Sequence, residues 1–242
     1  MVHSIPLEGI PIPETRLLSL WQVCDSFFPT GGYIHSYGLE TYIQRGLVRD
    51  EASLTEFLST YLIRAVARSE GLAIRLAYRA IREDDLEVLI QLDEVLDAQK
   101  LAREPREASA KVGRQFLNTG KLLCVTPALE AFLGLVREGK VQGHKALSFA
   151  LVGHGFDWGE DITVLAFMYI TANGMVTNAV RAVPLGQTTA QSVLQNLRTN
   201  GSVARAAGMS RGLTINDLGA VVPALDIRAM QHEQLYSTLF AS

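Results

Sequence analysis

Residues 17–48 read LLSLWQVCDSFFPTGGYIHSYGLETYIQRGLV, an apolar helical pattern followed by a break and an aromatic-rich segment that opens a second helix. The apolar residues recur at helical spacing as far as Phe28. Pro29 cannot continue that helix without losing a backbone hydrogen bond, and Gly31 and Gly32 permit backbone angles closed to other residues. The polar residues that follow lack the partners of a known catalytic motif. An organised loop without catalytic chemistry predicts a contact surface.

Beyond this stretch one apolar helical pattern follows another, and two-residue alternation is nearly absent, which predicts an all-α protein. Ser53 heads a capping box with Glu56, and Pro105 is expected to end the third pattern. Gly174 is expected at a close helix contact, because glycine costs stability inside a helix. Residues 208–222 are expected to form a long exposed loop. The expected later helices cover residues 54–65, 71–81, 86–104, 106–123, 127–138, 144–155, 161–183, 189–198 and 226–240.

These patterns predict one all-α domain of about nine or ten helices over residues 14–242, with a C-terminal docking tail. A proline-containing, extended arm is expected at residues 1–13. The chain has 242 residues and is 48% hydrophobic and 19% charged, which supplies a sizeable core and leaves apolar surface for an oligomer. Its net charge of −3 gives no electrostatic footprint for nucleic acid.

The motif inventory argues against several classes of protein. Cys24 and Cys124 are too few for a disulfide framework, and their apolar settings predict buried free thiols. The first residues lack the basic and apolar regions of a signal peptide, and no apolar run reaches the roughly 20 residues that span a bilayer. A cytoplasmic protein without membrane contact is therefore expected. Scattered histidines, no C-x-x-C and no P-loop predict that this chain alone binds no cofactor, metal or nucleotide.

Two further stretches carry residues for which we prefer a contact role to an ordinary structural one, which at His232 and Glu233 would be a surface ion pair. Residues 180–188 read VRAVPLGQT, where proline and glycine stop a helix. Arg181 offers five donors in a rigid fork near the C-terminus of that helix, and Gln187 and Gln191 follow it. In the C-terminal stretch, the sequence MQHE at residues 230–233 precedes Leu-Phe-Ala-Ser. These patterns favour contact surfaces over catalysis.

Together these stretches resemble the urease accessory protein F family (UreF). The family signature L-x-x-P-x-x-G-x-x-x-S-x-G-L-E is similar to residues 28–40, and the A-x-R-x-x-P-L-G-Q segment is similar to residues 179–187. The family's M-x-H-E and terminal L-F-x-S are similar to residues 230–233 and 239–242. A weaker similarity joins residues 106–114 to the family's central helix.

The resemblance implies a non-catalytic accessory protein that works with UreD and the GTPase UreG to load nickel into apo-urease. It also implies a homodimer that binds UreD through its C-terminal tail, recruits UreG and gates GTP hydrolysis, so that the complex handles nickel and GTP. It assigns partner contacts to a first surface of Pro29, Gly31, Gly32, Tyr33, Ser36, Gly38, Leu39 and Glu40, to a UreG-facing surface of Arg181, Pro184, Leu185, Gly186, Gln187 and Gln191, and to a UreD-facing end of His232, Glu233, Leu239, Phe240 and Ser242.

Two other classes of function stay open. The sequence GMSRG at residues 208–212 fits G-x-S-x-G, which would make Ser210 the nucleophile of a serine hydrolase, with Asp226 and His232 downstream. A nucleophile elbow needs a preceding strand, whereas the residues before Ser210 favour a helix. A generic helical adaptor unrelated to urease is the other class, because the composition suits many helical proteins. For a metal shared with a partner, His35 would be the first ligand to consider.

Overall fold

The computed structural model describes residues 13–32, 35–183, 185–220, 222–235 and 239–240, and within these ranges it contains helices and no strand. The all-α class is confirmed. The described ranges hold twelve α-helices, close to the nine or ten expected. The elements are α1 (Glu14–Cys24), α2 (Leu39–Gln44), α3 (Glu51–Tyr61), the π-helix η2 (Leu62–Val66), α4 (Glu70–Arg82), α5 (Leu86–Gln99), α6 (Arg103–Gly120), α7 (Pro127–Arg137), α8 (Lys145–Gly155), α9 (Glu160–Ala182), α10 (Gln187–Thr199), α11 (Ser202–Met209), the 3-10 turn η3 (Ile215–Asp217) and α12 (Pro223–His232).

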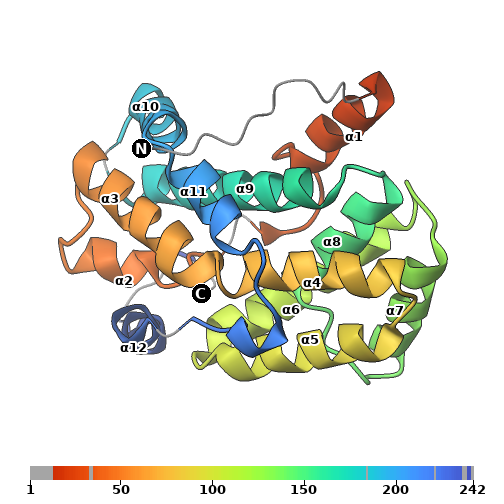
Figure 1. The fold of residues 1–242 in the computed structure, drawn as a ribbon. Helices are drawn as coiled ribbons and strands as arrows, with labels where there is room; N and C mark the ends of the chain where they lie inside the picture. The colour runs from red at the N-terminus through yellow and green to blue at the C-terminus, as the bar shows by residue number, and fades with distance from the viewer. Residues whose placement is uncertain (1–12, 33–34, 184, 221, 236–238, 241–242) are drawn as a thin grey trace.

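Helices α4, α8 and α9 form the centre of the bundle. Helix α8 is buried along most of its length and packs against α4, α6 and α9. Around this centre, α3, α10 and α11 pack on one end of α9, and α5, α6 and α7 lie at the other side of α4 and α8 (Figure 1). Helix α12 packs against α2 and α6. Helix α1 lies at the edge of the bundle, where its Ser19 hydroxyl accepts a hydrogen bond from Trp158 at 2.8 Å.

Helix α9 is the one described helix that is long and apolar enough to cross a membrane, judged by length and composition alone. Polar residues such as Thr171 and Asn173 interrupt its sequence, so it contains no continuous apolar run of that length. Half of its most apolar stretch is buried inside the structure, because α4, α8, α10 and α11 pack around it. That burial is typical of the core helix of a bundle, whose apolar faces are covered by protein.

The closest helix crossing occurs at Gly113 rather than at Gly174. A Cβ built on Gly113 would overlap the carbonyl oxygen of Gly143 and lie 2.6 Å from the backbone nitrogen of Lys145, so only glycine lets α6 approach the start of α8 this closely. A Cβ on Gly174 would meet no atom within 4 Å. The expected close contact at Gly174 is thus wrong.

Several helices begin or end away from the expected residues, and each shift has a local cause. The capping box of α3 is formed by Asp50 and Ser53, one turn before the expected pair of Ser53 and Glu56, because the Asp50 carboxylate accepts the Ser53 N–H at 2.9 Å. Helix α5 ends at Gln99, and Pro105 lies in the first turn of α6. Proline is tolerated there because a first-turn N–H has no acceptor within the helix.

The last helix is shorter than expected and ends at His232 instead of continuing to Phe240. The chain turns back beyond it, and the backbone N–H groups of Leu239 and Phe240 donate to a side chain of α2 in place of helix carbonyls. The expected loop at 208–222 begins only after α11. Its backbone is anchored, for example by the Gly219 N–H, which donates to the Arg68 carbonyl at 3.0 Å.

Both cysteines are free and half-buried. Burial raises the pKa of Cys24 to about 12 and that of Cys124 to about 11. Since the thiolate is the reactive form, we expect both thiols in the folded protein to react with iodoacetamide at pH 8 at least about a hundredfold more slowly than in urea. Mass spectrometry of timed samples measures this, and a Cys124→Ser variant isolates Cys24. Equal rates in buffer and urea would contradict the expected protection.

Candidate partner-binding sites

The side chain of Glu40 joins the first motif to the C-terminal segment. Glu40 is the second residue of α2 and is only 1% exposed. Its carboxylate accepts hydrogen bonds from His232 Nε2 at 2.9 Å, from the Leu239 N–H at 2.7 Å and from the Phe240 N–H at 3.2 Å. Gly38, just before α2, has φ 87° and lies against Ala229 of α12, so α12 can approach α2 closely. We call this cluster the Glu40 junction.

His232 links the Glu40 junction to a third helix. Its Nδ1 lies 2.7 Å from Glu104 Oε2, in the first turn of α6, while its Nε2 faces Glu40. A carboxylate only accepts hydrogen bonds, so a ring between two carboxylates is best satisfied when both of its nitrogens carry a proton. His232 is 1% exposed, and a buried charge of this kind is stable only when it is paired. His232 thus joins α2, α6 and α12 through buried and part-buried contacts.

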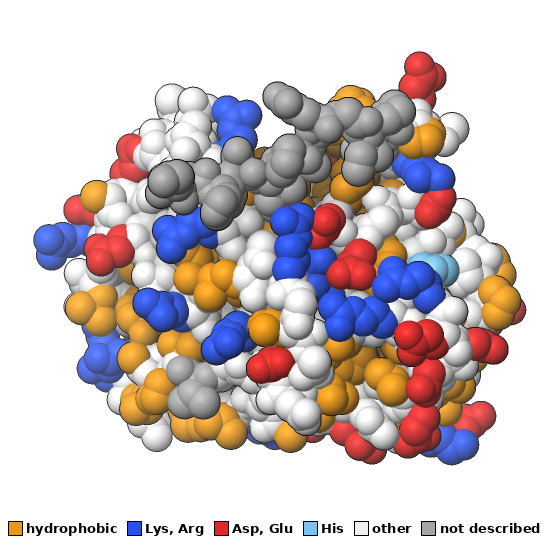
Figure 2. All heavy atoms as spheres, viewed as in Figure 1, with side chains coloured by type: hydrophobic (Ala, Val, Ile, Leu, Met, Phe, Trp, Pro, Cys, Tyr) orange, Lys and Arg blue, Asp and Glu red, His pale blue; other side chains and the backbone are white. Residues whose placement is uncertain are grey.

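Apolar side chains cover the outside of the Glu40 junction. Leu239 is 68% exposed although its neighbour Phe240 is buried, and Ile227 and Met230 on α12 are also exposed. Figure 2 shows hydrophobic side chains gathered over α2 and α12. Beside them Glu233 forms an exposed ion pair with Arg103 at 3.3 Å. Because the buried hydrogen bonds fix the backbone of residues 239–240, they also fix where Leu239 is presented.

The remaining residues of the first motif divide between surface and interior. Pro29 and Gly31 are exposed, and Gly32 is half-buried with Val112 of α6 beside it. Ser36 and Leu39 are buried. Because Ser36 and Leu39 are buried, they support the surrounding surface by packing beneath it. Their effect on the affinity for a partner stays a prediction. Tyr33, Pro184 and Ser242 lie outside the described residues.

The second motif surrounds one small pocket between α9 and α10. Arg181, Gln187 and Gln191 line it together with polar residues of α9, and its volume is about 170 Å³. All three side chains are exposed, as is Gly186, the N-cap of α10, and Leu185 is half-buried. Among the residues that the structure describes, Arg181 has no ion pair or side-chain hydrogen bond. This pocket lies on different helices from the Glu40 junction.

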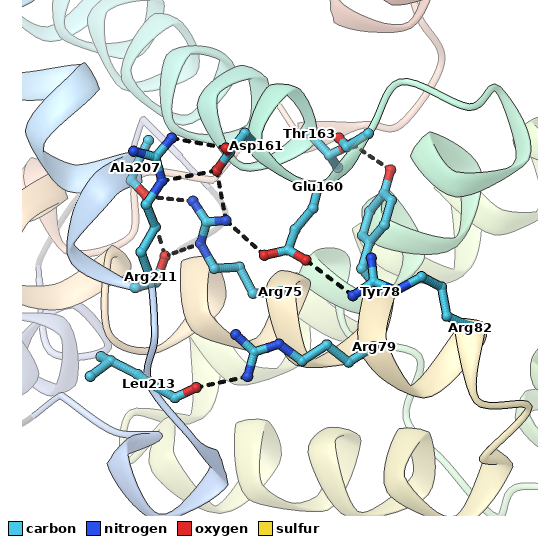
Figure 3. A network of polar contacts seen from close by, with 12 residues as sticks. Arg75, Tyr78, Arg79, Arg82, Glu160, Asp161, Thr163, Ala207, Arg211 and Leu213 are labelled. Atoms are coloured by element: carbon cyan, nitrogen blue, oxygen red, sulfur yellow. Dashed lines mark hydrogen bonds and ion pairs between the residues drawn. The ribbon is translucent and has the colours of Figure 1, made fainter. Parts of the chain in front are cut away.

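Sequence reasoning did not find the most extensive buried ion-pair cluster, which centres on Arg75 of α4 (Figure 3). Its guanidinium donates to Glu160 Oε1 and lies equally close to Asp161 Oδ1, both at 2.8 Å and both at the start of α9. It also donates to the Ala207 carbonyl and to the Ser210 hydroxyl, each at 2.9 Å. The only signal in the sequence is that Arg75 lies among apolar residues on both sides, in the sequence LAIRLAY of residues 72–78.

The geometry of Ser210 does not support the serine hydrolase hypothesis. Its hydroxyl is buried, accepts the Arg75 hydrogen bond and donates to the Ala207 carbonyl at 3.3 Å. The residue follows helix α11, whereas a nucleophile elbow follows a strand and exposes its hydroxyl. Ser210 therefore ties the end of α11 to α4. In the described part of the chain no group of three or more His, Cys, Asp or Glu is placed to hold a metal ion.

The fold and these sites define an all-α protein whose buried polar clusters hold external surfaces in position. The family profile of UreF matches residues 48–198. The urease accessory protein UreF of Lachnoclostridium phytofermentans is 36% identical over 95% of this chain and 100% of its own length. Those of Paenarthrobacter aurescens and Actinobacillus pleuropneumoniae serotype 5b are 39% and 40% identical, each over 94% of this chain and 99% of the relative. The chain belongs to the UreF family.

Proposed function

We propose that this chain is a non-catalytic scaffold in urease maturation, which bridges UreD and the GTPase UreG while nickel is inserted into apo-urease in the cytoplasm. The relatives' names supply the link to urease maturation. The observation that carries the scaffold role is the Glu40 junction, where hydrogen bonds from His232, Leu239 and Phe240 to the buried Glu40 carboxylate hold an apolar surface in place. The family resemblance adds a homodimer to this proposal.

The surface over the Glu40 junction has the composition of a protein interface, and we assign it to UreD. Exposed Ile227, Met230 and Leu239 supply apolar contacts, and the ion pair of Arg103 and Glu233 lies at the edge. Apolar centres with polar rims are typical of specific interfaces. A surface fixed by buried bonds before binding also loses little conformational entropy when the partner docks.

The pocket at Arg181 is assigned to UreG. An exposed arginine that pairs with no carboxylate among the described residues can bind a partner's carboxylate with two parallel hydrogen bonds. Gln187 and Gln191 in the same pocket add amide groups that both donate and accept. Binding UreG here, away from the UreD surface, would let the chain contact both partners at once and couple GTP hydrolysis to nickel release.

Replacing Arg181 with alanine should weaken UreG binding at least about tenfold, because arginines at interfaces are frequent hot spots. UreD binding should not change, since Arg181 lies on different helices from the Glu40 junction. Surface plasmon resonance with each partner measures both effects. Arg205→Ala on α11 is a matched control that removes another exposed arginine. If Arg205→Ala weakened UreG binding as much as Arg181→Ala, the assignment of this pocket would be wrong.

Urease activation tests the proposed function as a whole. Urease subunits, UreD, UreG and the nickel-binding accessory protein are expressed with and without this chain, and nickel content and urea hydrolysis are assayed. Nickel-containing, active urease should appear only with this chain. Equal activity without it would refute the maturation role, and binding to proteins other than UreD and UreG would then favour the generic adaptor.

A further inference from the structure

Two adjoining pockets meet in the interior beside the start of α8. One, of about 60 Å³, lies among α1, residues 28–32 and 35–37, and α9, and the other, of about 30 Å³, lies among η2, α4, α6 and α9. Tyr37, Lys145 and Thr171 are the described residues that line both. Together the pockets have room for roughly six to nine waters at about 10–15 Å³ each, or for a small polyatomic ion.

Each of these three residues carries a polar group without a partner. The Tyr37 and Thr171 hydroxyls are shielded from solvent and make no hydrogen bond. Lys145 Nζ makes no ion pair or hydrogen bond with any described residue, and it lies 5.2 Å from the centre of the Phe167 ring. Buried polar groups are nearly always paired, so two buried unpaired hydroxyls beside a half-buried ammonium without a carboxylate partner indicate a site for a ligand that accepts hydrogen bonds.

The backbone of Tyr37, which carries one of the three donors, is strained. Tyr37 has φ 50°, in the left-handed region that a bulky residue rarely adopts. Such strain is found mainly where the surrounding structure holds a residue for a purpose. Burial raises the pKa of Tyr37, so its hydroxyl keeps its proton and remains a donor.

The charges around Lys145 do not neutralise it. Burial lowers its pKa to about 8, an effect that Glu70 and Cys24 oppose and Lys100 reinforces. Glu70 is already paired with Lys100, and burial lowers the pKa of His35, which leaves that ring neutral at pH 7. The ammonium also lies at the positive end of the α8 dipole. An anion in the pocket would relieve this uncompensated charge.

Other acceptors near the pocket are engaged elsewhere. Asp25 is the carboxylate on the described wall of the larger pocket, and its Oδ1 accepts the Phe27 N–H at 2.7 Å. Asp93 accepts the N–H groups of Gly143 and His144 at the start of α8. Water could satisfy the two hydroxyls but not the charge, and a metal cation would be repelled by the ammonium.

We propose that Lys145, Tyr37 and Thr171 bind a small oxyanion, of the size of bicarbonate or phosphate, in this pair of pockets. The ammonium supplies charge and up to three donors, and each hydroxyl supplies one more. The oxygens of an oxyanion accept hydrogen bonds and so match the ammonium and the two hydroxyl donors. Lys145, Tyr37 and Thr171 belong neither to the surface over the Glu40 junction nor to the Arg181 pocket. The site is therefore independent of the proposed role in urease maturation, although Tyr37 is a neighbour of Ser36 and Gly38 in the first motif.

Calorimetric titration of the full-length protein with sodium bicarbonate or sodium phosphate, against sodium chloride at equal ionic strength and pH 7.0, tests the site. We expect saturable binding of at least one oxyanion and none of chloride. Lys145→Met should weaken it at least about tenfold, since hydrogen bonds to charged groups are the strong ones. Lys140→Met, which removes an exposed lysine paired with Glu138, is the matched control and should bind like the wild type.

Two conservative variants and a pH series keep the proposal testable if Lys145→Met does not fold. Thr171→Val and Tyr37→Phe keep the shape of the wall and should each weaken binding about fivefold. Wild-type affinity should fall as the pH rises through about 8, because the Lys145 ammonium then loses its proton. The proposal is overturned if neither oxyanion binds the wild type, or if all three wall variants bind as tightly as the wild type.

Discussion

Replacing Glu40 with glutamine should lower the free energy of unfolding by about 3 kcal/mol and detach residues 239–240 from the body of the protein. The carboxylate receives N–H groups of His232, Leu239 and Phe240 in a buried place. Glutamine keeps the volume but offers one acceptor oxygen instead of two, so at least one buried donor loses its partner. Urea denaturation measures the first effect, and hydrogen exchange of the Leu239 and Phe240 amides measures the second.

The same variant should lose most of its affinity for UreD, because Leu239 is no longer held in position. Glu233→Gln is the matched control: Glu233 follows His232 directly, but its carboxylate forms only an exposed ion pair. That control should unfold like the wild type, since exposed pairs contribute little. Normal protection of the Leu239 amide in Glu40→Gln would show that the carboxylate does not hold the tail.

Replacing Arg75 with methionine should destabilise the protein by about 3–5 kcal/mol, as removal of one partner from a buried ionic cluster usually does. The change removes the shorter of two side-chain hydrogen bonds to the Ala207 carbonyl and a cation from between Glu160 and Asp161. Thermal and urea unfolding measure the loss. Arg82→Met is the control, because Arg82 is an exposed partner of the same Glu160, at 3.5 Å. If both variants had the same stability, the buried position of Arg75 would not matter.

The Arg75 cluster also predicts a dependence on pH. Although burial acts to raise the pKa of Asp161, hydrogen bonds from Arg211 and Arg75 hold it below its ordinary value. A depressed carboxyl pKa stabilises the fold above the unfolded value of about 3.9, and that contribution is lost as the pH falls below it. The Arg75→Met variant should therefore lose less stability than the wild type between about pH 5 and pH 2.

Helix boundaries that depend on neighbouring residues were predictable from the sequence. Thr126 caps α7 because its hydroxyl accepts the Leu129 N–H at 3.2 Å, and a threonine followed by proline is a sequence pattern that predicts such a helix start. Gly139 has φ 71° just beyond the same helix, at a position where glycine predicts a helix end. Where distant contacts decide, the prediction was wrong: α12 ends at His232 because the chain returns to α2, a contact that no local pattern encodes.

In the candidate sites, too, local motifs were predictable from the sequence and contacts between distant residues were not. The sequence singled out Glu40 and His232 separately, within motifs that resemble those of the UreF family, but it did not predict that they touch. Glu104 escaped notice because an acidic residue in the first turn of a helix has an ordinary explanation in the helix dipole. Lys145 escaped notice because only the packing of α8 and α9 shows that its ammonium lies beside Phe167 and in one pocket with two unpaired hydroxyls.

The Glu40 junction also indicates at which stage of folding the apolar surface around Leu239 is formed. Glu40 is separated from His232 by 192 positions and from Phe240 by 200. Closing a flexible loop of that size costs about 5 kcal/mol of chain entropy, so we expect these contacts to form only after the intervening helices have collapsed. The apolar surface around Leu239 would then be completed last in folding and lost first in partial unfolding. A partner that binds this surface would therefore bind only chains that have finished folding.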